Sequence, residues 1–344
     1  MNSLERVLTA LNLEKPDRVP LLEWSVNPKV SKVLEPDLNS RQFMAKHLDV
    51  ITTFWSSAPE SADDITKNED GTLEYTDHWG IRRKDTGQDY PFPIGHPIQS
   101  PEDLADYTPP DPLEDQRLKR LRDVVDEYKG EKAICLTLNT TFTDAWGLVG
   151  MEEFFKYTIK DPEFAHELCD MTAKYHYKLA KEAIDTGAEI IMCGDDLAYK
   201  KGTMLSMDAF ESFLLPHYSK IADIVHDRDA YFIKHTDGDI WNLIDPFISI
   251  GADAINPIEP SAGMDIGEVK DTFGGRICIV GNIDCGDLLS RQEPEDVRRI
   301  VKDTIEKAGK GGGYILASDN EIHASVKPEN YRAMLKAASD YGRY

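Results

Sequence analysis

The chain has 344 residues, of which 41% are hydrophobic, and its 62 acidic and 39 basic side chains give a formal net charge of −23. A hydrophobic share of this size can build a large core, which excludes a wholly disordered protein. The negative charge repels phosphate backbones and anionic lipid, so we expect neither a nucleic acid nor a membrane surface as partner.

The N-terminal segment is predicted to be an amphipathic helix, because Leu4, Val7, Leu8 and Leu11 follow helical spacing. It carries charges throughout and lacks the apolar core of an export signal. No run in the chain approaches the roughly 20 apolar residues that a membrane span requires. Five cysteines without a close pair argue against a disulfide framework. We therefore expect a cytoplasmic protein.

Apolar runs and amphipathic stretches alternate along most of the chain. The expected strands are residues 17–24, a run ending near Trp55, and residues 133–138, 188–192, 230–234, 253–256, 276–280 and 314–316. The clearest expected helices are residues 207–226, 240–250, 294–308 and 328–341. This alternation indicates an α/β protein with a parallel sheet covered by helices. Eight such units close into a (β/α)8 TIM barrel. A doubly wound sheet is the alternative, but no GxGxxG follows a strand, which removes its usual dinucleotide-binding form.

Between the second and third expected strands the pattern is less regular. Glycine, proline and aspartate punctuate residues 68–112, and the alternation within residues 72–76 and 80–83 predicts a β-hairpin. We interpret about residues 60–112 as an insertion, and residues 1–344 as one barrel domain.

Polar or acidic side chains follow almost every expected strand. They include Glu23, Asn139, Asp195, Asp196, His235, Asp237, Asn256, Glu259, Asn282, Cys285, Asn320 and His323. The active site of a (β/α)8 barrel is built at the carboxyl ends of its strands. Acidic side chains gathered there repel one another unless protons, a cation or a ligand compensate. The rim is therefore predicted to be an active site. For a single residue such as Asp195 or Asp196, capping of a loop is the alternative.

The His-x-Asp pair of His235 and Asp237 is a candidate metal site. Two residues apart on an extended backbone, an imidazole and a carboxylate lie on the same side and suit a divalent ion such as zinc. Cys285 follows another strand and is a candidate third ligand. The alternatives are a hydrogen-bonded core histidine and a buried, inert cysteine.

Several segments, in one order, resemble the uroporphyrinogen decarboxylase superfamily over nearly the whole chain. They are ERVLTALNLEKPDRVPLLEW, MCGDDLAYKKGTMLSMDAFESFLLPHYSKI, IKHTDGDIWNLIDPFISIGADAINPIEPSAGMDI, GNIDCGDLL and ILASDNEIHASVKPENYRAML. The resemblance implies a (β/α)8 barrel, often a homodimer, with one of two chemistries. One is cofactor-free decarboxylation of the acetate groups of a tetrapyrrole. The other is zinc-dependent methyl transfer to or from a corrinoid (cobalamin) carried by a partner protein.

The decarboxylase branch resembles this chain poorly. Its arginine-bearing segment after the first strand corresponds here to residues 22–29, which contain no arginine. An acidic rim would also repel a substrate with eight carboxylates. The sequence is closer to the corrinoid-dependent methyltransferase branch.

The zinc ligands of that branch are only partly retained. Its His-x-Cys pair corresponds to His235 and Asp237, and its later cysteine corresponds to Asn320 or Asp319. Either histidine and carboxylates hold the metal, with Glu259 or Cys285 contributing, or the metal has been lost. A harder ligand set suits a zinc that polarises an oxygen better than one that holds a thiolate.

We therefore expect transfer of a methyl group from a small methoxylated or N-methylated substrate to a corrinoid protein, with zinc activation. The resemblance and the strand-end positions assign metal binding to His235, Asp237 and Cys285, catalysis to Glu23, Asp195, Asp196 and His323, and substrate binding to Asn139, Asn256, Glu259, Asn282 and Asn320. An exposed apolar surface is expected at the rim for the corrinoid partner. The alternatives are a metal-free decarboxylase or lyase of a small carboxylated substrate, and a non-catalytic barrel that binds a tetrapyrrole or another metabolite.

Overall fold

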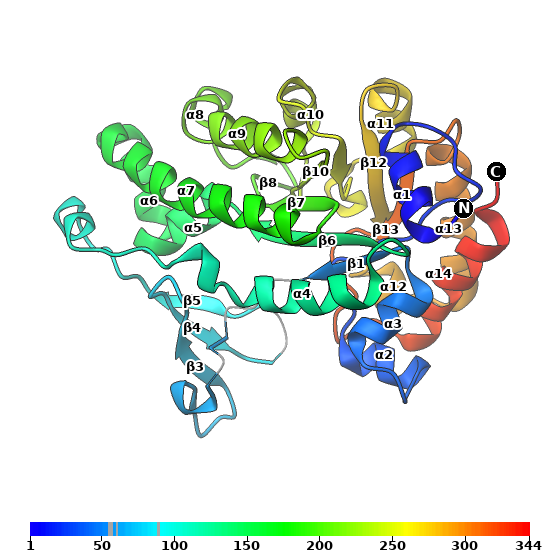
Figure 1. Cartoon of the computed structure of the whole chain (residues 1–344), viewed down its shortest axis with the longest axis horizontal. Helices are drawn as coiled ribbons and strands as arrows, with labels where there is room; N and C mark the ends of the chain where they lie inside the picture. The colour runs from blue at the N-terminus through cyan, green and yellow to red at the C-terminus, as the bar shows by residue number, and fades with distance from the viewer. Residues whose placement is uncertain (54–57, 60, 88–89) are drawn as a thin grey trace.

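A curled parallel sheet forms the centre of the computed structural model, which describes residues 1–53, 58–59, 61–87 and 90–344 (Figure 1). Its strand order is β1-β6-β7-β10-β11-β12-β13. The strands are β1 (Val50–Thr53), β6 (Ala133–Asn139), β7 (Ile190–Gly194), β10 (Tyr231–His235), β11 (Ala254–Asn256), β12 (Cys278–Ile283) and β13 (Tyr314–Ser318). The run predicted to end near Trp55 forms β1, and Trp55 lies outside the described residues. The predicted barrel class is confirmed.

The first expected strand, residues 17–24, is an extended segment rather than a β-strand. Leu21 forms an isolated parallel bridge with Leu316 of β13, and the Asp49 amide, just before β1, donates to the Leu21 carbonyl. A longer ladder does not form here, in part because Pro20 has no N–H to donate. The segment lies between the two edge strands and takes the eighth position around the barrel.

Helices surround this sheet on its outer side (Figure 1). They are α1 (Ser3–Leu11), α2 (Pro28–Leu34), α3 (Ser40–His47), α4 (Gln116–Tyr128), α5 (Thr141–Val149), α6 (Met151–Lys160), α7 (Pro162–Thr186), α8 (Met207–Phe213), α9 (Leu215–His226), α10 (Trp241–Ser249), α11 (Ile266–Phe273), α12 (Leu288–Arg291), α13 (Pro294–Ala308) and α14 (Pro328–Tyr341). The single helix predicted over residues 207–226 is two, because Pro216 has no N–H with which to continue α8 and lies instead in the first turn of α9. Among the described residues, no helix combines the length and apolarity that crossing a bilayer would need.

Helix α1 covers the end of the barrel at which the strands begin. An Asn2–Glu5 capping box starts it. Its buried residues Val7, Ala10 and Leu11 belong to the same apolar cluster as the side chains that fill the barrel interior. The helix thus closes one end of the barrel and leaves the other end for a site.

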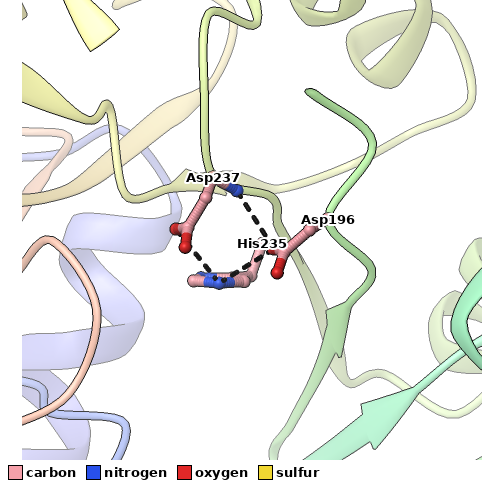
Figure 2. A group of neighbouring side chains, drawn as sticks. All are labelled: Asp196, His235 and Asp237. Atoms are coloured by element: carbon pink, nitrogen blue, oxygen red, sulfur yellow. Dashed lines mark hydrogen bonds and ion pairs between the residues drawn. The ribbon is translucent and has the colours of Figure 1, made fainter. Parts of the chain in front are cut away.

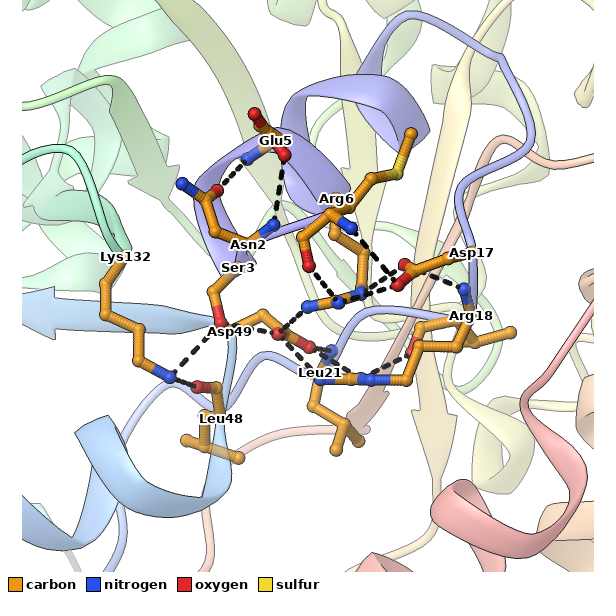
Figure 3. A network of polar contacts seen from close by, with 12 residues as sticks. Asn2, Ser3, Glu5, Arg6, Asp17, Arg18, Leu21, Leu48, Asp49 and Lys132 are labelled. Carbon is orange, nitrogen blue, oxygen red and sulfur yellow. Dashed lines mark hydrogen bonds and ion pairs between the residues drawn. The ribbon is translucent and has the colours of Figure 1, made fainter.

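A buried ionic network fastens this end of the molecule (Figure 3). The carboxylate of Asp49 is fully buried and accepts hydrogen bonds from Arg6, Arg18, the Ser3 hydroxyl and the Leu21 amide at 2.7–2.9 Å. Two guanidinium groups and further donors satisfy one buried carboxylate, as a buried charge requires. The network ties α1 to the start of β1.

An antiparallel sheet, β2-β3-β4-β5, projects from one side of the barrel (Figure 1). Its strands are β2 (Thr66–Lys67), β3 (Leu73–Thr76), β4 (Arg82–Asp85) and β5 (Phe92–Gly95). The predicted hairpin is present as β3 and β4. At its turn, the buried ring of Trp79 lies 4.9 Å from the ring of Tyr175 on α7, which fastens the sheet to the helices.

Candidate metal centre and cavity

Three potential metal ligands converge at the carboxyl ends of β7 and β10 (Figure 2). His235 is the last residue of β10, Asp237 follows it, and Asp196 follows β7. The His235 Nε2 atom lies 3.6 Å from Asp237 Oδ1 and 3.9 Å from Asp196 Oδ1. One ligand atom from each of the three residues lies within 4.8 Å of the others.

A second residue fixes the orientation of the imidazole. His235 Nδ1 lies 2.5 Å from Asn256 Oδ1, and the Asn256 Nδ2 atom donates to the Val280 carbonyl at 3.2 Å. Because the amide must donate to that carbonyl, its oxygen faces the ring, and Nδ1 carries the proton. The Nε2 lone pair is then turned toward the two carboxylates. Asn256, predicted to bind substrate, contacts the histidine instead.

The charge of this group favours a cation. Asp237 Oδ1 is buried and has no hydrogen-bond partner among the described residues. Burial and the neighbouring Asp196 and Glu259 carboxylates raise the pKa of Asp237 well above its ordinary value, and burial lowers the pKa of His235. The Nε2 lone pair of His235 and the carboxylates of Asp196 and Asp237 repel one another unless a positive charge lies between them. The residues therefore fit a divalent ion held by nitrogen and oxygen ligands.

Two further predicted residues support Asp237 from neighbouring loops. Asn320 Nδ2 donates to Asp237 Oδ2 at 2.8 Å. The Glu259 carboxylate accepts the Gly238 amide at 2.7 Å and the Ser261 hydroxyl. Its hydrogen bonds thus hold the loop that carries Asp237, and Glu259 lies outside the three-residue group.

An aromatic cavity of about 300 Å³ adjoins the group. Its walls include Trp24, Tyr90, Pro91, Phe92, Pro93 and Trp146, and its polar lining includes Arg83, Asn139, Thr143, Asp196, His235 and Asn320. The Trp24 ring lies 4.5 Å from the His235 ring. Gly194 permits this approach, because a Cβ atom there would lie 2.6 Å from the Trp24 ring. The volume suits a small ligand.

Asp195 has a different role from its neighbour Asp196. Its buried carboxylate accepts hydrogen bonds from the Thr140 hydroxyl, the Tyr218 hydroxyl and three backbone amides at the start of α5. A carboxylate at a helix N-terminus satisfies free N–H groups. These contacts support the capping alternative for Asp195.

Glu23, Asp319 and Cys285 form a second cluster of ionisable groups, outside the three-residue group but close to it, because Asp319 and Cys285 line a cavity with Asp237. The fully buried Glu23 accepts from the Ser318 amide and hydroxyl through Oε2, and its Oε1 has no hydrogen-bond partner among the described residues. Burial raises the pKa of Glu23 to about 8 and that of Asp319 to about 6. Asp319 accepts the Cys285 amide at 2.9 Å, and burial raises the pKa of the Cys285 thiol. Cys285 thus lies beside Asp319 rather than in the group of His235.

Two further predicted residues, Asn282 and His323, are not among the residues that line the aromatic cavity. Asn282 donates to the Ile258 carbonyl, and His323 accepts the Ser325 amide. Lys234, a fully buried lysine directly before His235, is not among the predicted site residues. The only indication of Lys234 in the sequence is that it is a single charged residue inside the apolar run 231–235.

The family model described as uroporphyrinogen decarboxylase (URO-D) matches residues 84–341, about three quarters of the chain. The chain belongs to the URO-D family. Members of this family are enzymes, which agrees with the clustered ionisable groups at the barrel mouth. The match includes every residue of the three-residue group.

Curated relatives of this URO-D family member have two different names. The methylated-thiol–coenzyme M methyltransferase of Methanosarcina mazei is 25% identical over 257 residues, which are 73% of this chain and 66% of that protein. A uroporphyrinogen decarboxylase of Alkalilimnicola ehrlichii is 26% identical over 261 residues, which are 70% of this chain and 67% of that protein. Identity therefore does not separate the two activities.

A solved structure confirms the fold over nearly the whole length of this chain. A methyltransferase from Methanosarcina mazei superposes with a TM-score of 0.74, at 19% identity and with 99% of both chains covered. The alignments with the curated relatives span only about two thirds of the length of those proteins, and a shared fold does not fix the reaction.

Proposed function

We propose that the protein is a methyltransferase that moves a methyl group from a small methoxylated or N-methylated substrate to a corrinoid on a partner protein. The observation that carries this proposal is the Asp196–His235–Asp237 group beside an aromatic cavity. Two comparisons support it: the sequence is similar to that of a named methyltransferase, and the fold is similar to that of a methyltransferase of known structure.

His235, Asp237 and Asp196 would hold a zinc ion. When bound, zinc supplies a Lewis acid that polarises the heteroatom that loses its methyl group. Asn256 keeps His235 Nε2 free of a proton, and Asn320 orients Asp237. The oxygen and nitrogen ligands present here suit an oxygen-bearing substrate better than a thiol.

The chain's own residues would position the substrate and admit the partner. The rings of Trp24, Phe92 and Trp146 enclose apolar parts of the substrate and exclude water from the reacting atoms. Tyr90, Phe92, Ile94 and Tyr199 are exposed apolar or aromatic side chains on β5, on the segment before it, and on the hairpin β8 (Ala198–Tyr199)–β9 (Gly202–Thr203) that follows β7. We propose that they contribute to the docking surface for the corrinoid protein.

The proposal is tested by metal analysis and methyl transfer. Purified protein is expected to bind about one zinc per chain, and cob(I)alamin absorbance should fall when a methoxylated aromatic compound or an N-methylated amine is added. His235→Ala should abolish both zinc binding and turnover. Stoichiometric turnover by metal-free protein, or by His235→Ala, would disprove the zinc-dependent version.

A metal-free carboxy-lyase is the second candidate, and the cluster of Glu23, Asp319 and Cys285 favours it. The raised pKa of Glu23, about 8, keeps a protonated carboxyl group near the site at neutral pH, and protonation of a carbanion is the step that follows loss of carbon dioxide. This candidate predicts carbon dioxide release that is insensitive to chelators. Loss of activity on chelation, restored by zinc, would reject it.

A further inference from the structure

Lys234 is a fully buried lysine under the proposed metal centre. It precedes His235 in β10, and adjacent residues of a strand point to opposite faces of the sheet. Its Nζ atom lies on the helical side, 5.1 Å from the ring centroid of Tyr218 on α9 and 5.5 Å from that of Phe247 on α10. Lysines are rarely buried without specific partners, so these surroundings need an explanation.

The partners are backbone carbonyl groups from the ends of two strands. Lys234 Nζ donates to the Asp195 carbonyl at 3.1 Å, to the Cys193 carbonyl at 3.4 Å, and to the carbonyl of His235. Cys193 and Asp195 belong to the end of β7 and the loop that follows it, whereas His235 ends β10. An ammonium group has three hydrogens, so these three acceptors use all of them.

The three carbonyls lie where the two loops with the acidic ligands leave the sheet. Asp196 directly follows one of them, and Asp237 lies two residues beyond another. The loops also contact each other, since the Leu197 amide donates to the Thr236 hydroxyl at 2.9 Å and the Asp237 amide to Asp196 Oδ1 at 3.3 Å. Lys234 therefore joins the two loops from below, on the side opposite the cavity.

We propose that Lys234 is a positioning residue that fixes the separation of Asp196, His235 and Asp237 by holding the carbonyls of both strand ends. The functional part of this inference, support of metal ligands, rests on the proposed metal centre. The structural part, that Lys234 holds the two loops together, does not depend on a metal. Lys234 touches neither substrate nor metal and acts only through the backbone.

Hydrogen exchange of the metal-free protein tests the geometric claim. In Lys234→Met, which keeps the length of the side chain and removes its donors, amides of residues 195–198 and 236–239 should exchange at least about tenfold faster. Lys132→Met is the matched control, because Lys132 also donates to a carbonyl, that of Leu48, near the opposite end of the barrel. It should leave these segments unchanged. Equal exchange in Lys234→Met and wild type would overturn the proposal.

Zinc affinity, measured by competition with a chromogenic chelator, tests whether the loop geometry held by Lys234 supports metal binding. A weakening of about 10- to 100-fold is expected in Lys234→Met, as for other residues that support metal ligands. A lower melting temperature with the zinc-induced shift unchanged would mean a merely structural role and would overturn the inference. If wild type binds no zinc, the proposed metal centre fails while the exchange data still decide the role of Lys234. Lys234→Gln, which retains a donor, should give an intermediate result, and unfolding of both variants would overturn the positioning role.

Discussion

Glu23→Gln is expected to change how the stability of the protein depends on pH. The Glu23 side chain is fully buried, and burial raises its pKa to about 8, against about 4.3 for an ordinary glutamate. Between these two values the unfolded chain releases the proton while the folded chain retains it. The free energy of unfolding therefore falls as pH rises, by about 1.4 kcal/mol for each pH unit that this group controls.

Glutamine reproduces the neutral form of this side chain at every pH. Its amide oxygen can accept from Ser318 as Oε2 does, and its amide nitrogen takes the place of Oε1, so no charge is ever buried. The variant and the wild type should have similar stability near pH 4.5. At pH 8 the variant should be more stable by a few kcal/mol, because the wild type has lost the contribution of its protonated carboxyl.

Urea unfolding at pH 5, 6, 7 and 8, followed by circular dichroism, measures this difference. Glu163→Gln, at an exposed glutamate on α7, serves as control and should follow the wild type at every pH. Parallel curves for wild type and Glu23→Gln would refute the conclusion that Glu23 is protonated in the folded protein.

Three further changes test the site and its supports. Asn256→Ala removes the acceptor for His235 Nδ1 and should weaken zinc binding by about 10- to 100-fold in a chelator competition, whereas unchanged affinity would contradict its orienting role. Asp49→Asn should lower the free energy of unfolding by about 3 kcal/mol, because the buried Arg6 then keeps only Asp17 as a counter-charge and the half-buried Arg18 loses its ion pair. Asp340→Asn, at a surface pair, should have a much smaller effect, and equal losses in urea would refute the argument. Asp195→Asn should lower stability by about 1–3 kcal/mol and leave zinc affinity within a few-fold of wild type, while loss of zinc binding in a folded variant would contradict its capping role.

The parallel sheet could be predicted because both faces of its strands are buried. Such strands appear as nearly unbroken apolar runs, and the segments before Asn139 and Gly194 show this pattern clearly. Residues 17–24 are also predicted to be a strand, from the apolar residues between Val19 and Trp24, but they form only an isolated bridge with β13. Whether an extended segment forms a ladder depends on how its neighbours align, which local composition does not encode.

The positions of the candidate residues at the strand ends could be predicted from the sequence, but the contacts of their side chains could not. Asp195 and Asp196 are neighbours of the same type, yet one accepts five hydrogen bonds beside α5 and the other has a side chain 57% exposed beside His235. Sequence position fixes the end of the strand at which a residue lies but not the direction of its side chain in the loop. Lys234 could not be identified from the sequence as a supporting residue. The three carbonyls that hold it belong to the backbone, so the types of the neighbouring residues do not indicate these contacts.

The antiparallel sheet and the barrel contribute different parts of the cavity. Phe92 and Pro93 belong to β5, and the adjoining Tyr90 and Pro91 complete that wall, while the potential metal ligands follow barrel strands. Under the proposed function, the residues that would select the substrate and those that would hold the metal thus lie in separate stretches of the chain. Exchange of residues 90–93 between relatives is therefore expected to change which molecule is bound and to leave the three potential metal ligands in place.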